Sequence, residues 1–339
     1  MVDRRPTIAD VARQAGVSKG LVSFVFNERP GVAPKTRDRI LAVAQEMGWR
    51  PRPSARSLSI DRSYALGLVV RRRPQVLSTD PFFPAFMAGV ETVLSGAGQV
   101  LVLSLVPDEE AERQTYRTLL ADARVDGVFL TDLQRSDPRI ALLAEIGLPA
   151  VTIGRPEVEQ PFPAVTLDDA PGVAETVTHL HGLGHRRIAY VAGDVEMVHG
   201  RRRRASFLAE MERLGCPIDL VIHTDFTAAQ AMAATTTLLD LPEPPTAIAY
   251  ASDLMAIAAV GVLHERGLQV PRDVSVAGFD GIDLGRCIYP TLTTVMADPV
   301  GWGQEAARVL LQLVSSGAAE DYDLPAARLV VRDSTGAPP

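Results

Sequence analysis

One face of a predicted helix over residues 19–27 carries side chains that are suited to binding another molecule. With Ser18 as the N-cap, the inward positions of this helix are Leu21, Val22 and Val25. The outward positions are Lys19, Gly20, Ser23, Phe24 and Asn27. A lysine can donate hydrogen bonds to guanine O6 and N7, and a phenylalanine offers apolar contact to a thymine methyl group. This face is therefore suited to reading base edges, and Ser23 fits either a phosphate contact or a plain solvent-facing position.

The distribution of charge indicates a nucleic-acid partner for this end of the chain. The protein has 339 residues and a formal net charge of −7. Residues 1–60 hold eleven Lys or Arg and five Asp or Glu, a net charge of +6, which leaves −13 for the remainder. Attraction to phosphate supplies most non-specific affinity for DNA, so the basic end is the candidate DNA module and the acidic remainder is repelled by the duplex.

Two further helices are needed to hold this face in place. One is predicted over residues 8–15, with Thr7 as its N-cap and Gly16 as its left-handed stop. Its inward side chains are Ile8, Val11, Ala12 and Ala15. A third helix starts near Pro34 and ends at Gly48. The first two helices meet across a tight turn, which is the helix-turn-helix arrangement.

These residues carry a family resemblance. The run TIADVARQAGVSKGLVSFVFN, followed by VAPKTRDRILAVAQEMGWRP, resembles the headpiece of the lactose-repressor (LacI/GalR) family. The resemblance implies DNA contacts from Thr7, Ser18, Lys19, Gly20, Ser23, Phe24 and Asn27. Leu21 stands where the family usually has Thr, and Phe24 where it often has Arg or His. We therefore expect a different operator, with Lys19 and Phe24 setting its half-site preference.

Residues 50–60 are similar to the family's hinge segment. Two prolines and three serines fall within a stretch too short to hold a helix alone in water. The resemblance implies that hinge helices from two subunits fold in the minor groove, with Leu58 as a wedge between base steps and Arg56 on phosphate. The alternative is a plain interdomain linker, with Leu58 packed on the following strand.

Beyond residue 62, short apolar runs alternate with helical patterns. One set comprises YALGLVV at 64, VLVLSLV at 100, GVFLT at 127 and PAVTIG at 149. Another comprises RRIAYVAG at 186, IDLVIHT at 218, TAIAYA at 246 and VSVAGFD at 274. Near-continuous apolar strands separated by amphipathic helices predict parallel sheets buried on both faces. Two sets predict two lobes, with a ligand cleft at the carboxyl ends of the strands.

The body also resembles the LacI/GalR family, and therefore the periplasmic sugar-binding fold. The matching pieces include DPFFPAFMAGVE, LGHRRIAYVAG and SDLMAIAAVGVLHERGLQVPRDVSVAGFD. The resemblance implies a sugar or nucleoside effector bound by Asp80, Phe82, Phe83, Asp168, Arg203, Phe226, Ser252, Asp253 and Asp280. In such a site aromatic faces stack on a ring, and Arg and Asp side chains exchange directional hydrogen bonds with hydroxyl groups.

Some of these acidic and aromatic residues also fit structural roles. Asp280 directly follows the strand VSVAGF and faces the cleft, unless it caps a loop. One of Phe82 and Phe83 is expected in the core, because aromatic pairs are often buried. At Asp253, N-capping of the next helix competes with ligand contact.

The remaining polar residues are also open to two interpretations. Arg203 lies in the run from Arg201 to Arg204, which also fits a solvated basic face. Ser206 replaces a glycine that usually follows in the family, and Ser252 replaces a common asparagine. These two departures bear on which ligand the cleft accepts.

Other residue types argue against metal binding and catalysis. Cys216 and Cys287 lack partners at metal spacing, so two buried, reduced thiols are expected. His179, His181 and His185 flank two glycines, which favours a helix end over a metal site. No G-x-G-x-x-G sequence follows the first strand and no catalytic triad is apparent, so we expect neither a cofactor nor an enzyme.

Together these patterns predict a small all-α helix-turn-helix headpiece and an α/β two-lobed body with parallel sheets. The headpiece with its hinge spans 1–60, and an effector-binding and dimerisation domain spans 62–339. One lobe is expected to comprise 62–163 and 293–320, and the other 164–292 and 321–339. We expect a cytoplasmic homodimer, without a membrane span, that binds a palindromic operator and changes its DNA affinity with a small polar metabolite. The alternatives are a solute-binding protein of sugar uptake, which predicts a signal peptide, and a Rossmann enzyme.

Overall fold

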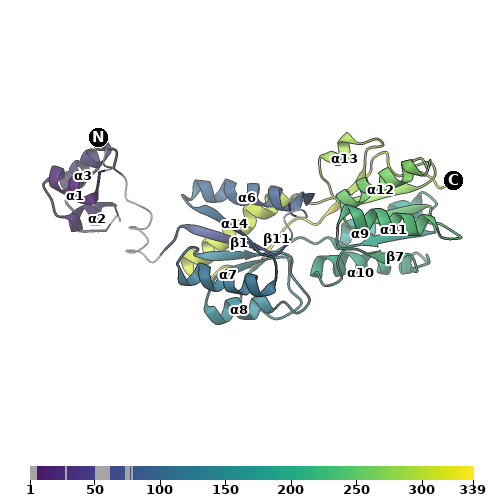
Figure 1. The fold of residues 1–339 in the computed structure, drawn as a ribbon, viewed down its shortest axis with the longest axis horizontal. Coiled ribbons are helices and arrows are strands. Elements are labelled where there is room, and N and C mark those ends of the chain that lie inside the picture. Colours follow the sequence, from purple (N-terminus) through teal and green to yellow (C-terminus); the bar gives the residue numbers. More distant parts are fainter. Residues whose placement is uncertain (1–5, 27–28, 50–61, 73–76, 78) are drawn as a thin grey trace. The chain divides into compact units, whose positions relative to one another are not determined.

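The computed structural model describes residues 6–26, 29–49, 62–72, 77 and 79–339 (Figure 1). The chain divides into two compact units, Met1–Tyr64 and Ala65–Pro339. Asn27 of the expected DNA face, and the expected hinge residues Arg56 and Leu58, lie outside the described residues. Within the described ranges, no helix combines the length and the apolar character needed to cross a membrane.

The headpiece has the helices that the capping signals predict. They are α1 (Ile8–Ala15), α2 (Lys19–Phe26) and α3 (Pro34–Glu46). The carboxylate of Asp10 accepts hydrogen bonds from the backbone NH and the hydroxyl of Thr7, and Gly16 ends α1 at φ 64°. The hydroxyl oxygen of Ser18 accepts a hydrogen bond from the backbone NH of Leu21. The buried apolar side chains form one cluster: Val11, Ala12, Ala15, Val22, Val25, Ile40 and Ala44.

The first sheet of the body has the strand order β11-β5-β4-β3-β1-β2. Its strands are β1 (Ala65–Val70), β2 (Val100–Leu105), β3 (Gly127–Leu130), β4 (Ala150–Ile153), β5 (Ala164–Thr166) and β11 (Tyr322–Asp323). All of its neighbouring strands run parallel. The helices that cover it are α6 (Phe82–Gly96), α7 (Glu109–Ala121), α8 (Pro138–Ile146) and α14 (Pro299–Ser316). Helix α6 packs on α14 and α7 on α8, and Figure 1 shows these pairs on opposite faces of the sheet.

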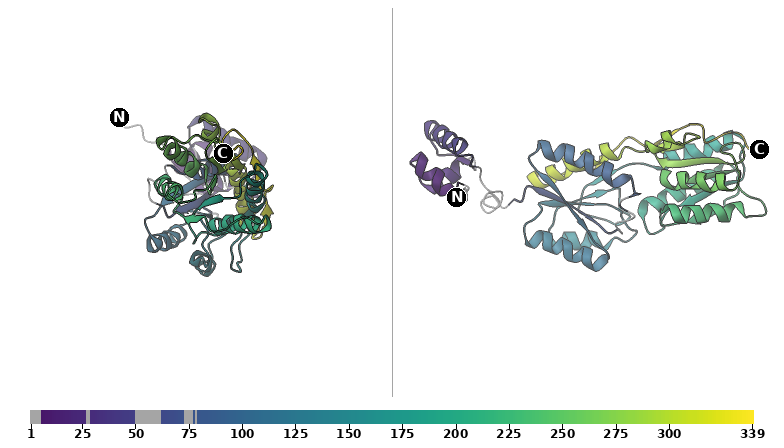
Figure 2. Two further views of the ribbon diagram at one scale, coloured as in Figure 1. Left: turned by 90° about the vertical axis from the view of Figure 1, so that its right-hand side faces the viewer. Right: turned by 45° about the horizontal axis from the view of Figure 1, so that its top comes forward.

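The second sheet has the strand order β12-β10-β9-β8-β6-β7, and β12 alone of these strands is antiparallel to its neighbour. The right-hand view of Figure 2 shows the helices that flank this sheet, in teal and green. Its strands are β6 (Ile188–Ala192), β7 (Val221–His223), β8 (Ala247–Tyr250), β9 (Ser275–Asp280), β10 (Thr293–Met296) and β12 (Arg328–Val330). Its helices are α9 (Ala170–Gly182), α10 (Val198–Arg213), α11 (Ala228–Leu239), α12 (Asp253–Glu265) and the short α13 (Leu284–Cys287). Helix α9 packs on α10 and α11 on α12. The two parallel sheets flanked by helices agree with the predicted fold class.

The chain crosses between the two sheets at places that differ from the expected lobe boundaries. Strand β5 pairs with β4, and β11 pairs with β5, so residues 164–166 and 322–323 belong to the first sheet and not to the second. Strand β10 pairs with β9, so residues 293–296 belong to the second sheet and not to the first. Apolar periodicity marks a buried strand, but it does not say which of two sheets that strand joins.

Two expectations about burial are wrong. Val100, Leu103 and Leu105 of β2 are exposed, because β2 lies at the edge of its sheet. Cys216 is buried as expected, but Cys287 at the end of α13 is exposed. An apolar run or a lone cysteine does not reveal whether a neighbouring element covers it.

Helices α6 and α14 approach each other closely through two glycines. A Cβ atom on Gly89 would lie 2.0 Å from the carbonyl oxygen of Val300. A Cβ atom on Gly303 would lie 2.1 Å from the carbonyl oxygen of Phe86. A backbone carbonyl cannot rotate away as a side chain can, so this contact requires glycine at both positions.

We expect Gly303→Ala to lower the free energy of unfolding by about 1–3 kcal/mol, the usual cost of overpacking. Gly261→Ala in α12 is the matched control, because nothing lies within 4 Å of its added Cβ. Alanine is favoured over glycine in a helix interior by about 1 kcal/mol, so the control is expected to be more stable than wild type. Urea unfolding followed by circular dichroism measures both, and a Gly303→Ala protein as stable as wild type would contradict the close approach.

Candidate functional site

A cavity of about 590 Å³ lies between the two lobes of the body. Its lining comes from segments after β1 and β3 of the first sheet, from segments at the ends of β8 and β9 of the second, and from the start of α14. Parallel sheets in α/β proteins bind ligands at the carboxyl ends of their strands, and pockets for small molecules usually measure about 300–1,000 Å³. The cavity is therefore the candidate site for a small ligand.

The structure brings most of the predicted ligand residues to this cavity. Those that line it are Asp80, Phe82, Arg203, Phe226, Ser252 and Asp280. They come from both lobes, although more than 100 residues separate Phe82 from Arg203 in the chain. Their contact with a ligand remains a prediction.

The other predicted residues, Phe83, Asp168 and Asp253, do not line the cavity. Phe83 is 1% exposed and packs in the apolar core of the first lobe, one position along α6 from Phe82. Asp168 is exposed, and its neighbour Asp169 lines the cavity instead. Asp253 is fully buried and accepts a hydrogen bond from the hydroxyl of Thr294 at 2.5 Å. In each case the family pattern places the right segment, but side-chain direction decides which residue faces the cavity.

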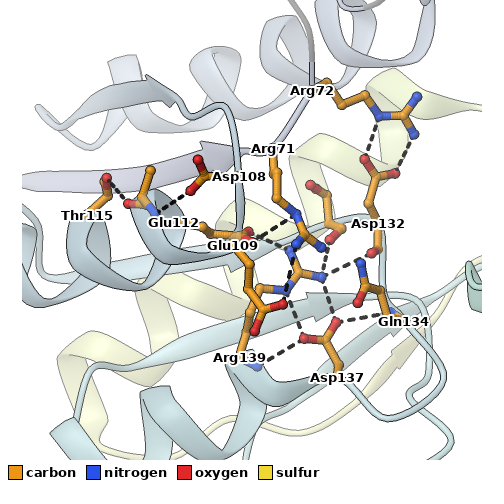
Figure 3. Close-up of polar contacts among 12 residues, drawn as sticks. Arg71, Arg72, Asp108, Glu109, Glu112, Thr115, Asp132, Gln134, Asp137 and Arg139 are labelled. Carbon is orange, nitrogen blue, oxygen red and sulfur yellow. Dashed lines mark hydrogen bonds and ion pairs between the residues drawn. The ribbon is translucent and has the colours of Figure 1, made fainter.

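On the first lobe, Arg72 is the centre of an ion cluster, the Arg72 group (Arg72, Asp80 and Asp132). Its Nε and Nη2 donate hydrogen bonds to the two carboxylate oxygens of Asp132, at 2.8 and 2.9 Å (Figure 3). Its Nη1 donates to Asp80 at 3.3 Å. Burial alone lowers the pKa of Arg72, but the two carboxylates outweigh burial and raise it. The guanidinium is therefore held in one orientation, and its charge is compensated before any ligand arrives.

On the second lobe, Arg203 is the centre of the Arg203 group (Arg203, Asp169 and Asp280). Its Nε donates to Asp169 at 2.9 Å, and its Nη1 lies 4.0 Å from Asp280. The guanidinium carbon lies 3.5 Å from the centre of the Phe279 ring, a cation–π contact. The Arg203 side chain is only 11% exposed, which excludes the alternative of a solvated basic face.

Asp280 combines backbone strain with an unfavourable environment for its charge. Its φ of 114° lies in the region that residues other than glycine rarely adopt. Burial raises the pKa of Asp280 well above its ordinary value, and the attraction of Arg203 offsets this only in part. Its Oδ2 accepts a hydrogen bond from the backbone NH of Asp253 at 3.4 Å, so it lines the cavity and also contacts the start of α12.

Flat apolar faces lie on both walls of the cavity. The Phe226 ring lies directly beside Gly193. A Cβ atom on Gly193 would lie 1.9 Å from the Cζ atom of this ring. The His199 ring centre lies 5.3 Å from that of Phe226, and burial lowers the pKa of His199 to about 3, so this imidazole is neutral. On the first-lobe side, Trp302 and Phe82 contact each other edge to face at 5.9 Å. Such surfaces are suited to a ring-shaped ligand.

Some cavity residues were not predicted from the sequence: Arg72, Asp132, Asp169, His199 and Trp302. Arg72 comes shortly after β1, and Asp132 comes shortly after β3. The strand-end rule that selects Asp280 also selects these two residues. Trp302 lies in the first turn of α14, where no local pattern distinguishes a cavity residue from a core residue.

The outer face of α2 presents the expected DNA-reading residues to solvent. Lys19 and Gly20 are exposed, Ser23 is half-buried and Phe24 is 42% exposed. The guanidinium carbon of Arg29 lies 5.4 Å from the centre of the Phe24 ring, which adds a positive charge beside this face. Thr7 and Ser18 lie at the starts of α1 and α2.

The histidines near the end of α9 have hydrogen-bond partners of their own. His179 contacts the hydroxyl of Thr335 at 2.9 Å. His185 contacts the hydroxyls of Thr246 and Ser275 at 2.8 and 3.0 Å. In the part of the chain that the structure describes, no group of three or more His, Cys, Asp or Glu side chains is arranged to hold a metal ion.

We expect Asp280→Asn to raise the free energy of unfolding at pH 8 by about 1 kcal/mol or more. The pKa of Asp280 is higher in the folded than in the unfolded chain, so its stabilising contribution is complete below about pH 4 and is lost as the pH rises through the folded-state pKa. The gain is therefore largest at pH 8 and absent near pH 3, as urea unfolding at both pH values can show. Asp283→Asn, which removes an exposed carboxylate at the same cavity, is the control. A gain of equal size at both pH values would refute the role of burial.

Comparisons with known proteins cover nearly the whole chain. Residues 7–52 match the family of bacterial regulatory proteins, lacI family, and residues 177–335 match a periplasmic binding protein-like domain. The HTH-type transcriptional regulator CelR of Thermobifida fusca is 36% identical over 336 residues, with 98% of each chain covered. The HTH-type transcriptional repressor CytR of Escherichia coli K12 is 31% identical over 339 residues, with 98% of this chain and 97% of CytR covered.

Solved structures are similar over the same extent. A complex of the transcriptional regulator CelR with cellobiose has 35% identity and a TM-score of 0.74, with 97% of this chain and 100% of that chain covered. The Lac repressor dimer bound to operator and the anti-inducer ONPF has 30% identity and a TM-score of 0.86, with 98% and 100% covered. With its helix-turn-helix headpiece and two-lobed α/β body, this protein belongs to the lacI family of bacterial regulatory proteins.

Proposed function

We propose that this protein binds a palindromic operator through paired headpieces and changes its affinity for that operator when an uncharged saccharide occupies the cavity. One observation carries the proposal. A single chain joins a basic helix-turn-helix headpiece to a cavity in which each lobe supplies a guanidinium already neutralised by carboxylates.

The charges of the cavity support an uncharged ligand. Arg72 and Arg203 are each paired with aspartates, so an anionic ligand would have to compete with fixed carboxylates for both cations. Hydroxyl groups both donate and accept hydrogen bonds, so they match a wall that offers guanidinium donors beside carboxylate acceptors. The rings of Phe226 and Trp302 add apolar faces for a sugar or nucleoside ring.

Cellobiose is the first compound to test, because the related CelR has been solved in complex with it. We propose that the ligand contacts the predicted cavity residues and the newly found ones. The predicted set is Asp80, Phe82, Arg203, Phe226, Ser252 and Asp280. The added set is Arg72, Asp132, Asp169, His199 and Trp302.

A second copy of this chain is the proposed partner of the apolar edge of the first lobe. Val100, Leu103 and Leu105 are exposed on the edge strand β2. Large exposed apolar patches on soluble proteins usually mark contact surfaces, and a related repressor is solved as a dimer on its operator. A dimer places two headpieces on the two half-sites of a palindrome.

The alternative of a solute-binding protein for sugar uptake does not hold, because the relatives that span the whole chain are transcriptional regulators and repressors. The proposal assigns no chemical reaction to the cavity. The minor-groove roles of Leu58 and Arg56, and the folding of hinge residues 50–60 on DNA, remain predictions on residues that the structure does not describe.

Ligand binding can be tested first and operator binding second. We expect thermal-shift screening with cellobiose, other neutral sugars and nucleosides to reveal a compound that raises the melting temperature. That compound is then expected to change the affinity for a selected inverted-repeat duplex at least about fivefold at fixed salt. A protein that prefers no inverted repeat over random DNA, with or without these compounds, would contradict the proposed function.

Base reading by Lys19 has a separate test. We expect Lys19→Ala to relax the preferred base at one position of each half-site and to weaken binding there by about 1–3 kcal/mol. Lys35→Ala is the control, because Lys35 is exposed on α3 outside the reading helix. Selection from a random duplex library measures both preferences, and a Lys19→Ala consensus identical to that of wild type would refute the assignment.

A further inference from the structure

Behind the first-lobe wall of the cavity lies a buried ion cluster, the Arg139 cluster (Arg139, Asp137 and Glu112; Figure 3). Nε and Nη2 of Arg139 donate to the two carboxylate oxygens of Asp137 at 2.8 and 2.6 Å, and Nη1 donates to Glu112 at 3.0 Å. Arg71 Nε lies 3.3 Å from the other oxygen of Glu112. At most 5% of each side chain in the cluster is exposed.

Such a cluster contributes little net stability, because the cost of removing charges from water offsets much of their attraction. Its geometry is more informative. Nη2 of Arg139 also donates to the backbone carbonyl oxygens of Thr131 and Asp132, at 2.9 and 3.0 Å. Asp137 accepts a hydrogen bond from the backbone NH of Gln134 at 3.0 Å. The cluster therefore holds the backbone of residues 131–134 at three points.

This segment faces the ligand cavity. Thr131 and Asp132 line it, and the Asp132 carboxylate makes the bidentate contact with Arg72. Asp132 has a φ of 51°, a left-handed conformation that needs support from its surroundings when the residue is not glycine. Arg139 supplies that support through the Asp132 carbonyl oxygen.

The same segment also forms a direct contact with the second lobe. The backbone NH of Val198 donates to the carbonyl oxygen of Leu133 at 2.8 Å, and the NH of Arg135 donates to Glu196 at 3.2 Å. Gln134 and Met197 between them form an antiparallel bridge. The buried side chain of Val198 packs in the apolar cluster of the first lobe. A short ladder thus joins the lobes beside the cavity.

We propose that Arg139 is a positioning residue for the contact between the lobes. By fixing the backbone of residues 131–134, it presents Asp132 to Arg72 on one side and Leu133 to Val198 on the other. A ligand in the cavity and the contact between the two lobes therefore both involve the same segment, residues 131–134. The regulatory meaning of this link rests on the proposed function, whereas the link itself is a property of the ligand-free protein.

Hydrogen exchange of the ligand-free protein, read by mass spectrometry, tests the link without DNA or effector. Arg139→Lys keeps the buried charge but cannot make the planar, forked set of contacts. We expect at least a tenfold faster exchange of the amides of Arg135 and Val198, whereas peptides from β6 and β9 of the second lobe exchange as in wild type. Arg124→Lys, at an exposed arginine of the same lobe, is expected to leave all of these amides unchanged.

Asp137→Asn is a second, nearly isosteric variant, which weakens the hydrogen bonds of residue 137 with Arg139 and Gln134. We expect the same increase in the exchange rate of the Val198 amide. Unchanged exchange at Val198 in a folded Arg139→Lys protein would overturn the proposal. Faster exchange throughout the second lobe, or failure of both variants to fold, would also overturn it, because the cluster would then serve general stability. None of these outcomes depends on whether the protein binds an operator or a sugar.

Discussion

A guanidinium placed beside a cavity and away from water must have carboxylates at fixed positions, because an uncompensated buried charge costs several kcal/mol. The body meets this requirement once on each lobe, in the Arg72 group and in the Arg203 group. Arg72 and Asp132 follow the neighbouring strands β1 and β3, whereas Arg203 of α10 lies beside Asp280 at the end of β9. The packing of strands and helices therefore determines which charges meet. In both groups the guanidinium charge is already compensated, and the paired donors and acceptors favour a ligand rich in hydroxyl groups.

The same requirement extends behind the cavity. The Arg139 cluster compensates its own buried charges and also supports the backbone that presents Asp132 to the cavity. Residues next to Asp132 then pair with the second lobe beside Val198. Ligand recognition and contact between the lobes therefore share one segment of the first lobe, which is the kind of connection that a ligand-controlled DNA-binding protein requires.

Much of the headpiece could be predicted from the sequence, because its signals are local. Thr7, Ser18 and Gly16 mark helix ends through interactions with residues three or four positions away, and the helical spacing of Val11, Val22 and Ile40 places them in the core. The apolar strands of the body and their division into two sheets were also predictable. The places where the chain crosses between sheets were not, because β5 and β10 each pair with the strand that precedes them, and apolar periodicity does not show which sheet a strand joins.

The segments that line the cavity were predictable, and six of the nine predicted residues line it, but in some segments a neighbouring residue does so instead. Resemblance selected the turn before α9, but Asp169 faces the cavity where Asp168 was expected. It selected the start of α6, but only Phe82 of the phenylalanine pair lines the cavity. Successive side chains point in different directions on a helix and to opposite faces on a strand, so a shift by one residue within the right segment takes a side chain away from the cavity. The strand-end rule selects Arg72 and Asp132 one by one, but their pairing depends on β1 and β3 lying side by side, which no local pattern reveals.

Under the proposed function, the cavity and the headpiece share one binding equilibrium. If so, the effector and the operator must change each other's affinity by the same factor, because linkage between two binding sites is reciprocal. The most direct measurement is isothermal titration of the identified effector into the protein with and without saturating operator, at one fixed salt concentration. We expect the ratio of effector affinities to equal the ratio of operator affinities measured with and without effector. An effector affinity that does not change when operator is bound would contradict it.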